Sequence, residues 1–523
     1  MSVNCNKKFN IFPNISMIIN KGDSIKMNLA NNLVQNYKNK PNKICLIQNK
    51  DKVTYEDLYK RVSNFAVYLK KRGIKQGSNV LVLVPMSIDL YVTLLAIWSI
   101  GATACFMDAG FIKNGMKKNK FEEIDSVIGV TKYLIYANIN KNIRKLKIKI
   151  NVNEISNLKT NSEFEIYDVK SDTPAILTYT SGTTGIPKIA SRSHYFLSIQ
   201  GKILKKYLNY EEKDIELSSV PIFTLSNIDV GITTCIAEGK YTNLGHSNAQ
   251  KLVRQIINQK INRFMAAPGL LNVITHYCRE NSIQLEDINK IFTGGGAIFL
   301  DFIDDLKKVF PNAKIVTLYG STEAEPIAEL DLDNMTQDDI RKIKDGNGIL
   351  AGKIIGVEDC KIINTGIEEI GNLSNEQFEK TTTKGIGEIV VTGENVLKGY
   401  VNGIGDRENK FSVDGKKYHR TGDLGFIDEK NRLWLRGRIK EPFFNIEAAL
   451  HANFKMGKTA VFKSNDKIIL VLERDNIISE EDIKKAISFE KIDEIKYVKK
   501  IPVDKRHSSK VDYKELKKIL KME

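Results

Sequence analysis

The sequence lacks any run of apolar residues long enough to cross a lipid bilayer. Its most apolar stretch, residues 80–107, is interrupted by Pro85, Ser87 and Asp89, whereas a spanning helix needs about 20 predominantly apolar residues. Residues 1–12 are polar and contain lysine, without the apolar core of a secretory signal peptide. We therefore expect a soluble, cytoplasmic protein with no transmembrane segment.

Cysteine is also scarce. The six cysteines stand at positions 5, 45, 105, 235, 278 and 360, too far apart to supply the closely spaced pairs that zinc sites use. They are most simply free thiols in a reducing compartment.

Acidic residues are fewer than basic ones. The chain has 79 Lys plus Arg against 63 Asp plus Glu, a formal charge of +16, which raises nucleic-acid or anionic-membrane binding as a possible function. Apart from local runs such as residues 117–120 and 144–149, however, the lysines are interleaved with acids, and there is no zinc finger, RNP-type aromatic motif or basic arm. Solvated lysine-rich faces are the favoured interpretation, so we expect no nucleic-acid partner; an acidic phosphopantetheine carrier protein is one partner that such a surface could favour.

The pattern of apolar residues predicts an α/β fold. A helix should begin at Thr54, with Asp57 as its capping-box partner, and it should be followed by a strand over residues 80–84 and a helix over residues 88–100. The alternation resumes with strands over residues 219–222, 263–267 and 290–293 and helices over residues 249–259 and 268–279. Such alternation indicates a largely parallel sheet with both faces covered.

The length of 523 residues suggests two to four domains or subdomains. From about residue 345 the segments become shorter, glycine-punctuated and β-like, as in residues 387–393, which predicts a small β-rich subdomain. From about residue 437, short strands such as residues 468–473 alternate with helices such as residues 479–487. We therefore predict a large N-terminal domain over residues 1–436 and a small α+β domain over residues 437–523, joined by a tight hinge.

The most informative segment is Thr180-Ser181-Gly182-Thr183-Thr184-Gly185-Ile186-Pro187-Lys188. Glycines let the backbone approach phosphate oxygens, hydroxyl groups donate hydrogen bonds, and lysine adds a positive charge. It is not a Walker A loop, because only two residues separate Gly182 from Gly185. A plain surface turn is the alternative, but the loop follows an apolar strand over residues 175–179, and α/β sheets bind ligands at strand ends.

Four further motifs follow in order. A glycine cluster, Gly294-Gly295-Gly296-Ala297, ends a short strand, and Tyr319-Gly320-Ser321-Thr322-Glu323 ends another. The latter supplies a ring that can stack on a base and a carboxylate suited to Mg²⁺. Thr421-Gly422-Asp423 is followed by Gly437-Arg438, and Lys510 stands near the C-terminus. Each motif alone could be an ordinary turn or a solvated lysine.

Together, these motifs resemble those of the acyl-adenylate-forming (ANL) superfamily of AMP-dependent synthetases and ligases, which includes acyl-CoA synthetases, peptide-synthetase adenylation domains and luciferases. The resemblance implies ATP-dependent activation of a carboxylic acid, with ATP and Mg²⁺ as cofactors and transfer of the acyl group to CoA or a phosphopantetheine carrier. It implies that Glu323 holds the metal, that Lys440 is the hinge, and that Lys510, Thr322 and Lys188 act in catalysis. Phe223 is placed in the acid pocket. ATP or AMP would be bound by Thr180, Ser181, Gly182, Thr183, Thr184, Gly185, Gly295, Gly296, Ala297, Tyr319, Gly320, Ser321, Asp423 and Arg438.

The fate of the adenylate is left open by the sequence. Residues 106–110, residues 220–225 and the Arg506-His507 tail resemble the olefin β-lactone synthetase branch, in which the hydroxyl group of a β-hydroxy acid closes a lactone. The family's His-x-x-Gly segment is absent after residues 219–222, and the hairpin that lines the pantetheine tunnel in thioester-forming relatives is shortened. A catalytically silent nucleotide-binding protein is a third alternative. Against it stands a retained set of functional residues: Thr184, Lys188, Glu323, Asp423, Arg438 and Lys510.

Overall fold

The predicted capping box opens helix α2 (Tyr55–Lys71) in the computed structural model, which describes residues 26–107, 124–158, 164–180, 188–239, 246–367, 369–474, 478–503 and 510–522. The Thr54 hydroxyl oxygen accepts a hydrogen bond from the backbone N–H of Asp57, and the Asp57 carboxylate accepts one from the backbone N–H of Thr54. This reciprocal cap satisfies two N–H groups that the first turn leaves open. The apolar face of α2 is buried in the core of the first lobe.

A six-stranded sheet forms that first lobe, in the order β10-β9-β5-β4-β6-β7. All neighbours are parallel except β9 and β10, which form an antiparallel pair. The predicted strand over residues 80–84 and helix over residues 88–100 are confirmed as β4 and α3. The strands are β4 (Asn79–Leu83), β5 (Thr103–Met107), β6 (Ser126–Gly129), β7 (Ile148–Asn151), β9 (Pro174–Thr180) and β10 (Lys188–Ser193). The helices beside them are α2, α3 (Ile88–Ser99), α5 (Thr131–Ala137), α6 (Lys141–Arg144) and the 3-10 helix η2 (Val152–Asn157). A separate short pair joins β1 (Lys26–Met27) to β8 (Val169–Lys170).

A second, larger sheet runs through the middle of the molecule and has 15 strands within the described residues. Its parallel part has the order β15-β14-β13-β11-β12-β2. From β16 onward neighbouring strands are antiparallel except for β19, which pairs in parallel with β21, and β17 to β23 continue the same hydrogen-bonded sheet. The predicted β-rich region after residue 345 is therefore present as an extension of this sheet. Its parallel part and the flanking hairpin comprise β2 (Ile44–Gln48), β3 (Asp51–Thr54), β11 (Ile215–Ser218), β12 (Thr233–Ile236), β13 (Arg263–Ala266), β14 (Lys290–Gly294) and β15 (Lys314–Ser321). The antiparallel part comprises β16 (Ala324–Asp331), β17 (Ile349–Ile354), β18 (Asp359–Ile363), β19 (Asn372–Leu373), β20 (Gly387–Thr392), β21 (Lys410–Val413), β22 (Lys416–Ile427) and β23 (Arg432–Arg438).

Helices accompany this sheet and bury its apolar residues. The core beneath α9, α10 and α11 extends from Ile47 to Trp434 and includes Ala448 of the C-terminal part. The α-helices are α1 (Asn31–Asn39), α7 (His194–Tyr207), α8 (Pro221–Val230), α9 (His246–Asn258), α10 (Pro268–Glu280), α11 (Leu300–Val309), α12 (Gln337–Lys344), α13 (Asn375–Thr381) and α14 (Asp406–Asn409). Two 3-10 helices, η3 (Leu332–Asn334) and η4 (Val401–Gly403), lie between them.

One predicted strand is wrong. Residues 219–222 do not form a strand: β11 ends at Ser218, and α8 begins at Pro221. Proline at the first helical position lacks only an N–H that the helix would not use, and its fixed φ suits the first turn. The apolar residues around it were read as a strand because short apolar runs do not distinguish the two structures.

The C-terminal part is the predicted compact α+β unit. Three strands, which form one antiparallel and one parallel pair, pack with three helices over two small apolar clusters. The predicted strand over residues 468–473 and helix over residues 479–487 are confirmed as β25 and α16. The elements are α15 (Phe444–Asn453), β24 (Thr459–Ser464), β25 (Lys467–Glu473), α16 (Glu480–Ala486), β26 (Glu494–Val498) and α17 (Tyr513–Ile519).

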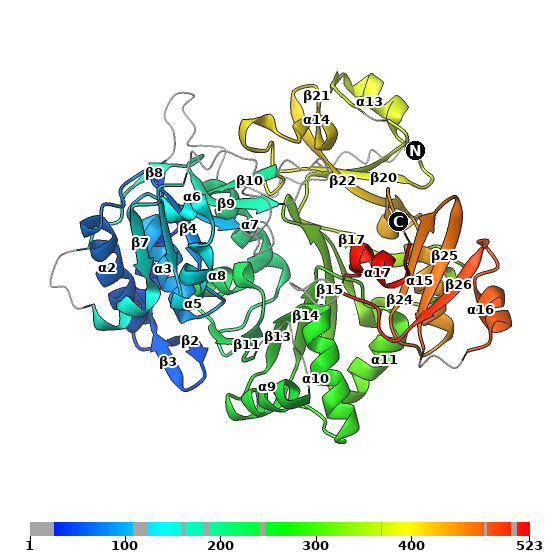
Figure 1. Ribbon diagram of the computed structural model, residues 1–523, viewed down its shortest axis with the longest axis horizontal. Helices are drawn as coiled ribbons and strands as arrows, with labels where there is room; N and C mark the ends of the chain where they lie inside the picture. Colours follow the sequence, from blue (N-terminus) through cyan, green and yellow to red (C-terminus); the bar gives the residue numbers. More distant parts are fainter. Residues whose placement is uncertain are drawn as a thin grey trace, which may run out of the picture.

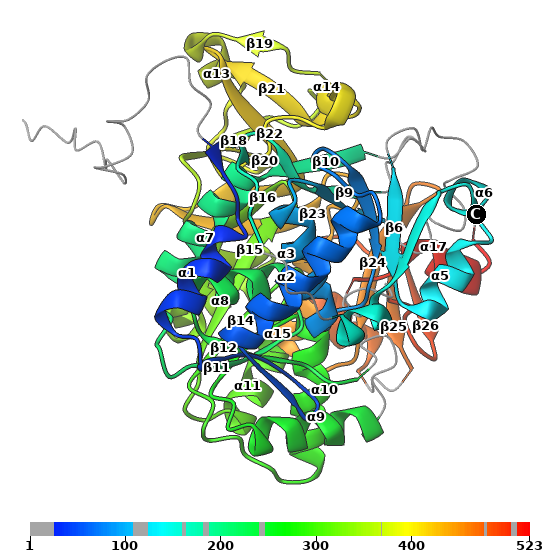
Figure 2. The ribbon, with the colours of Figure 1, turned by 90° about the vertical axis from the view of Figure 1, so that its left-hand side faces the viewer.

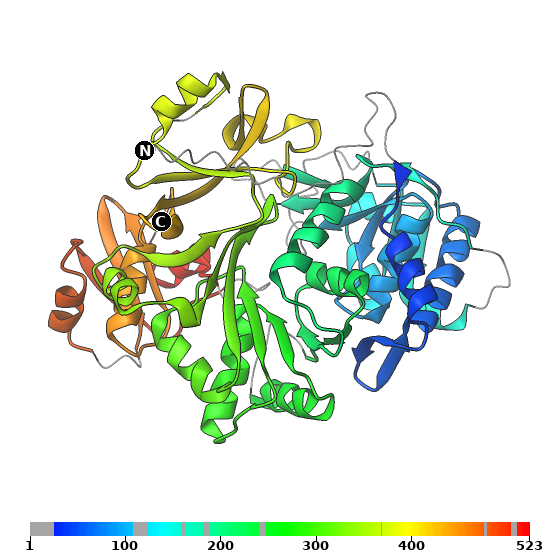
Figure 3. The ribbon, with the colours of Figure 1, turned by 180° about the vertical axis from the view of Figure 1, so that it is seen from behind.

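The first lobe and the C-terminal unit lie at opposite ends of the long axis of the molecule. Figures 1 and 3 show the blue first lobe at one end and the orange and red C-terminal elements at the other, with the green strands of the large sheet between them. The C-terminal unit contacts the large domain through α15, whose His451 Nδ1 lies 2.9 Å from Asp301 of α11. No helix within the described ranges is long and apolar enough to span a bilayer.

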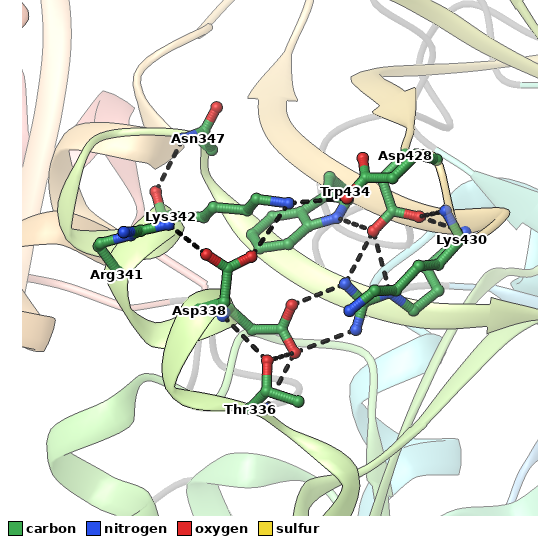
Figure 4. A network of polar contacts seen from close by, with 11 residues as sticks. Thr336, Asp338, Arg341, Lys342, Asn347, Asp428, Lys430 and Trp434 are labelled. Carbon is green, nitrogen blue, oxygen red and sulfur yellow. Dashed lines mark hydrogen bonds and ion pairs between the residues drawn. The ribbon is translucent and has the colours of Figure 1, made fainter.

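A buried ion-pair network fixes α12 to the last strand of the large domain (Figure 4). Arg432 of β23 donates to both carboxylate oxygens of Asp339, at 3.0 and 2.6 Å, and to Asp428 at 2.9 Å. The indole N–H of Trp434 also donates to Asp428, at 3.0 Å. These contacts hold β23, which leads directly into the C-terminal unit.

We expect Arg432→Met to lower the free energy of unfolding by about 3 kcal/mol, because it leaves the buried carboxylates of Asp339 and Asp428 without their cation. Arg341→Met, which removes an exposed pair with Asp338 on the same helix, should leave it nearly unchanged. Denaturant unfolding of both variants beside the wild type measures the difference. Equal stability of the two variants would show that Arg432 does not stabilise the buried carboxylates.

Candidate active site

The glycine cluster lies at the carboxyl edge of the parallel strands, as predicted. β14 ends at Gly294, which pairs with Leu318 of β15. A Cβ atom at Gly294 would lie only 2.6 Å from the Leu318 carbonyl oxygen, so no other residue fits. Gly295, Gly296 and Ala297 follow at this edge, beside the segment from Tyr319 to Glu323 that ends β15.

Three of the predicted nucleotide-binding residues are in direct contact. The Tyr319 hydroxyl donates to Asp423 Oδ2 at 2.7 Å, and Arg438 Nε donates to Asp423 Oδ1 at 2.9 Å. Asp423 and Arg438 are partners in the antiparallel pairing of β22 with β23. The strand register therefore places a cation beside the carboxylate, and the hydroxyl of Tyr319 fixes its second oxygen.

A buried glutamate holds the part of β22 that carries Asp423. Glu388 of β20 accepts hydrogen bonds from Arg420 Nε at 2.8 Å and from the Gly422 backbone N–H at 3.2 Å. The Thr421 hydroxyl donates to the Ile389 carbonyl at 2.9 Å. Motif reasoning did not identify Glu388 or Arg420, because each acts through another residue on a neighbouring strand.

Lys510 belongs to the C-terminal unit, yet its charge acts on Asp423 of the large domain. Burial raises the pKa of Asp423, while Arg438, Tyr319 and the charge of Lys510 oppose that rise. An antiparallel bridge between Val503 and Val511 fixes the backbone next to Lys510, whose side chain is exposed. Tyr319 and Arg438 therefore both hold the Asp423 carboxylate, and the charge of Lys510 helps to lower its pKa.

The predicted hinge residue lies in a tight turn. Backbone hydrogen bonds join Arg438 N to Glu441 O at 3.1 Å and Glu441 N to Arg438 O at 2.9 Å, which leaves exposed Lys440 between them. The Ile439 N–H also donates to the Gly422 carbonyl at 3.0 Å. The turn is therefore attached to the strand that carries Asp423.

A second group of residues surrounds Glu323, at the turn between β15 and β16. The Tyr400 hydroxyl donates to Glu323 Oε1 at 2.9 Å. The ammonium groups of Lys188 and Lys410 lie 5.6 and 5.5 Å from the centre of the Tyr400 ring, within cation–π range. Thr322 is exposed beside Glu323. Tyr400 thus connects the predicted metal-binding carboxylate to the lysine that follows the phosphate loop.

Two buried residues near Glu323, Lys410 and His419, have shifted pKa values. Burial lowers the pKa of Lys410 to about 7, although Glu323 and Asp406 raise it. Burial also lowers the pKa of His419 to about 3, so this ring is neutral and donates from Nδ1 to the Asn409 carbonyl at 3.1 Å. For Glu323, burial would raise the pKa, but the Tyr400 hydroxyl and the Lys410 charge help to hold it below its usual value. Glu323 is therefore ionised at neutral pH.

The shifted pKa of Lys410 predicts a pH-dependent stability. The folded protein loses this proton near pH 7 and the unfolded chain near its ordinary value of 10.5. Because the unfolded state binds more protons at this residue between these values, the contribution of Lys410 to stability should rise with pH across that window. From pH 7 to 9 we expect this contribution to grow by about 2 kcal/mol, a gain that Lys410→Met loses relative to the wild type.

Denaturant unfolding at both pH values measures this gain. Lys417→Met, which changes an exposed lysine of β22, is the matched control and should keep the wild-type dependence. The same dependence in Lys410→Met as in the wild type would show that Lys410 does not titrate in this range.

The structure describes only the two ends of the phosphate loop, Thr180 and Lys188. Thr180 ends β9 and pairs with Lys188, the first residue of β10, so the loop closes an antiparallel hairpin at a strand end. Gly405 has a φ of +95°, and a Cβ atom there would lie 2.8 Å from Lys188 Cδ, so the stem of Lys188 packs against this glycine. The predicted binding residues Ser181, Gly182, Thr183, Thr184 and Gly185 lie outside the described residues, as does Arg506-His507.

Phe223 lies at the edge where β13, β14 and β15 end. It belongs to the first turn of α8 and is buried in a small apolar cluster with Met265, Phe292, Val316 and Leu318. These partners come from the strands that carry the glycine cluster and Tyr319. The predicted pocket residue is thus packed against β13, β14 and β15, and β14 and β15 carry Gly294 and Tyr319.

A comparison with protein families identifies this arrangement. A model of the family described as AMP-binding enzyme matches residues 33–401. The chain belongs to the AMP-binding enzyme family. It is accordingly an AMP-forming ligase, which activates a carboxylic acid with ATP as an acyl-adenylate.

Among curated relatives, this AMP-binding enzyme is similar to 4-coumarate-CoA ligase 1 of Narcissus pseudonarcissus, with 23% identity over 513 residues, 89% of this chain and 88% of the relative. It is also similar to an olefin beta-lactone synthetase of Xanthomonas campestris pv. campestris, with 23% identity over 407 residues, 74% of this chain and 72% of the relative. One of these relatives is named as a CoA ligase and the other as a beta-lactone synthetase.

Solved structures share the fold of this AMP-binding enzyme. O-succinylbenzoate coenzyme A synthetase of Bacillus subtilis in complex with AMP has a TM-score of 0.74 and 18% identity, covering 94% of this chain and 98% of that one. An anthranilate CoA ligase in complex with anthranoyl-AMP has a TM-score of 0.77 and 17% identity, covering 94% and 97%. The predicted α/β architecture, with a large N-terminal part and a small C-terminal unit, is confirmed.

Proposed function

We propose that the AMP-forming site is built around Asp423 and Glu323. Asp423 and Arg438 bind the ribose hydroxyl groups, and Tyr319 stacks on adenine beside the glycine cluster. Ser321 and Thr322 contact the α-phosphate, and Lys188 with the preceding loop contacts the outer phosphates. The observation that carries this proposal is that Tyr319 and Arg438 both hold the half-buried carboxylate of Asp423, whose pKa the charge of Lys510 helps to lower.

Glu323 is the residue proposed to hold Mg²⁺. Among the described residues no group of three or more His, Cys, Asp or Glu side chains could hold a metal ion. A single ionised carboxylate together with nucleotide phosphates is, however, a usual environment for magnesium. The lowered pKa of Glu323 fits this role. The ion would offset the negative charge of the phosphates.

The chemical step brings together two anions, the substrate carboxylate and the triphosphate. Catalysis must therefore supply positive charge and alignment. Lys510 bridges the attacking carboxylate oxygen and an α-phosphate oxygen, and Lys188 stabilises the charge that accumulates on the departing pyrophosphate. Because Lys510 belongs to residues 437–523, it reaches this position only when the C-terminal domain is turned toward residues 1–436. Lys440 is the hinge for that movement.

Transfer of the acyl group to a thiol, either CoA or the pantetheine of an acidic carrier protein, is the proposed second step. The names of the ligase relatives support it. The five described cysteines are buried and none of them forms a disulfide, which supports the reducing cytoplasm as the compartment.

Closure of a β-lactone is the alternative second step. In the structure, the turn at residues 438–441 leads through Pro442 and Phe443 straight into α15. Such a short connection leaves no hairpin to line a pantetheine tunnel, which favours capture by the acid's own hydroxyl group. The similarity to an olefin beta-lactone synthetase supports the same alternative.

One assay distinguishes these functions. Pyrophosphate release would be measured with fatty, β-hydroxy, aryl and amino acids, each with and without CoA, and the acyl product would be identified by mass spectrometry. A thioester supports thiol transfer, and a product that has lost water without taking up CoA supports the lactone. Absence of acid-dependent pyrophosphate release across the panel would contradict both, and ATP binding without turnover would identify a silent nucleotide-binding protein.

A further inference from the structure

The crossover between β6 and β7 forms an outer corner of the first lobe, which we call the α5–α6 corner (residues 131–149). β7 is the edge strand of the six-stranded sheet, and α5 and α6 precede it in the chain. Figure 2 shows the two cyan helices along one side of the molecule. The proposed adenylation chemistry uses no residue of this corner.

Apolar side chains are concentrated on the outside of this corner. Tyr133, Ile135, Tyr136 and Ile139 are exposed, and the two isoleucines are 66% and 76% exposed. Elsewhere in the described ranges, no two exposed large hydrophobic residues lie within seven positions of each other in the sequence. Isoleucines exposed to this degree project from the surface instead of lining a groove.

The inner side of the same corner is well packed. Ala137 and Ile143 are buried in the apolar cluster that lies against β4, β5 and β6, and Leu134 and Leu146 pack against it. The Lys149 ammonium donates to Asn138 at 2.8 Å and so ties β7 to the end of α5. The outer apolar residues are thus exposed on a fixed scaffold, where burying them would stabilise a complex.

The charge of this corner is of one sign. Residues 126–153 contain no aspartate or glutamate but six basic residues: Lys132, Lys141, Arg144, Lys145, Lys147 and Lys149. All of these except Lys149 are exposed. This is the setting of the basic run at residues 144–149, which the adenylation function leaves unexplained.

We propose that the α5–α6 corner docks on the surface of an anionic lipid bilayer. Projecting isoleucines can enter the boundary between headgroups and acyl chains, tyrosines suit the interface itself, and lysines pair with lipid phosphates. Stable docking takes two such signals together, an apolar insertion and a basic patch. Nucleic acid would use the charges but would have no use for Ile135 and Ile139.

The test is co-sedimentation of the full-length protein with vesicles. Vesicles of phosphatidylcholine with about 30% phosphatidylglycerol should bind the protein at low salt, and pure phosphatidylcholine vesicles should bind it at least about tenfold more weakly. Ile135→Ser/Ile139→Ser should lower binding about tenfold, because it removes the inserted groups. Lys141→Glu/Lys145→Glu should lower it by at least about tenfold.

A matched control separates this corner from general stickiness. Ile257→Ser/Ile519→Ser changes two exposed isoleucines on other helices and should leave vesicle binding unchanged. All variants should keep wild-type pyrophosphate release, which shows that they are folded and that the adenylation site is intact. The proposal is overturned if anionic vesicles do not bind, if both vesicle types bind equally, or if the corner variants bind like the wild type. Binding of an acidic carrier protein in place of vesicles, lost in the same variants, would assign the corner to that partner instead.

Discussion

Lys510→Ala should lower acid-dependent pyrophosphate release about 100- to 1,000-fold while leaving ATP binding largely intact. Its charge is proposed to stabilise the reacting carboxylate and α-phosphate oxygens only as the new bond forms, and removal of one such group has effects of this size. The charge of Lys510 helps to lower the pKa of Asp423. Its loss should therefore appear mainly in kcat.

Two comparisons make this prediction specific. Lys514→Ala removes an exposed lysine from α17 in the same unit and should behave as the wild type. Lys510→Arg retains the charge and should recover part of the rate. If Lys510→Ala turns over at a near-normal rate, the lysine has no part in adenylate formation.

Asp423→Ala should lower kcat/KM for ATP by about 100-fold. The substitution removes a carboxylate that is proposed to accept hydrogen bonds from two ribose hydroxyl groups, and each such charge-assisted bond contributes about 1.5 to 3 kcal/mol. It also leaves Arg438 without its ion-pair partner. Calorimetric titration with ATP, together with steady-state kinetics, measures the loss.

Tyr319→Phe is the control for Asp423. It keeps the ring but removes the hydroxyl that fixes Asp423 Oδ2, so the loss in ATP affinity should be smaller, about tenfold or less. An equally large loss in both variants would mean that the hydroxyl, and not the carboxylate, dominates binding. Unchanged ATP affinity in Asp423→Ala would place the ribose elsewhere.

Much of the fold could be predicted because its signals are local. The capping box of Thr54 and Asp57 and the apolar strand β4 each depend on a few neighbouring residues. The strand predicted over residues 219–222 failed for the same reason: within such a short apolar run, Pro221 was compatible with either structure, and it begins α8. Local signals also could not show that β17 to β23 extend the large sheet, since that pairing joins distant segments.

The site residues divide in the same way, into those that stand in local motifs and those that do not. Tyr319, Asp423, Arg438 and Lys510 stand in short motifs and could be named from the sequence. Their contacts could not, because Tyr319 and Asp423 are 104 positions apart. Tyr400, Lys410 and Glu388 carry no local signature: one more lysine in a lysine-rich chain is unremarkable until folding buries it beside Glu323.

The turn at residues 438–441 links the proposed nucleotide site directly to the proposed hinge. Arg438 holds Asp423 with its side chain and also begins the turn that contains the proposed pivot, Lys440. A rotation at Lys440 therefore pulls on the strand end that supports the nucleotide, and a nucleotide that orders Asp423 and Arg438 stiffens one anchor of the pivot. Release of AMP and reorientation of the C-terminal domain would then be coupled, because both change the same strand end.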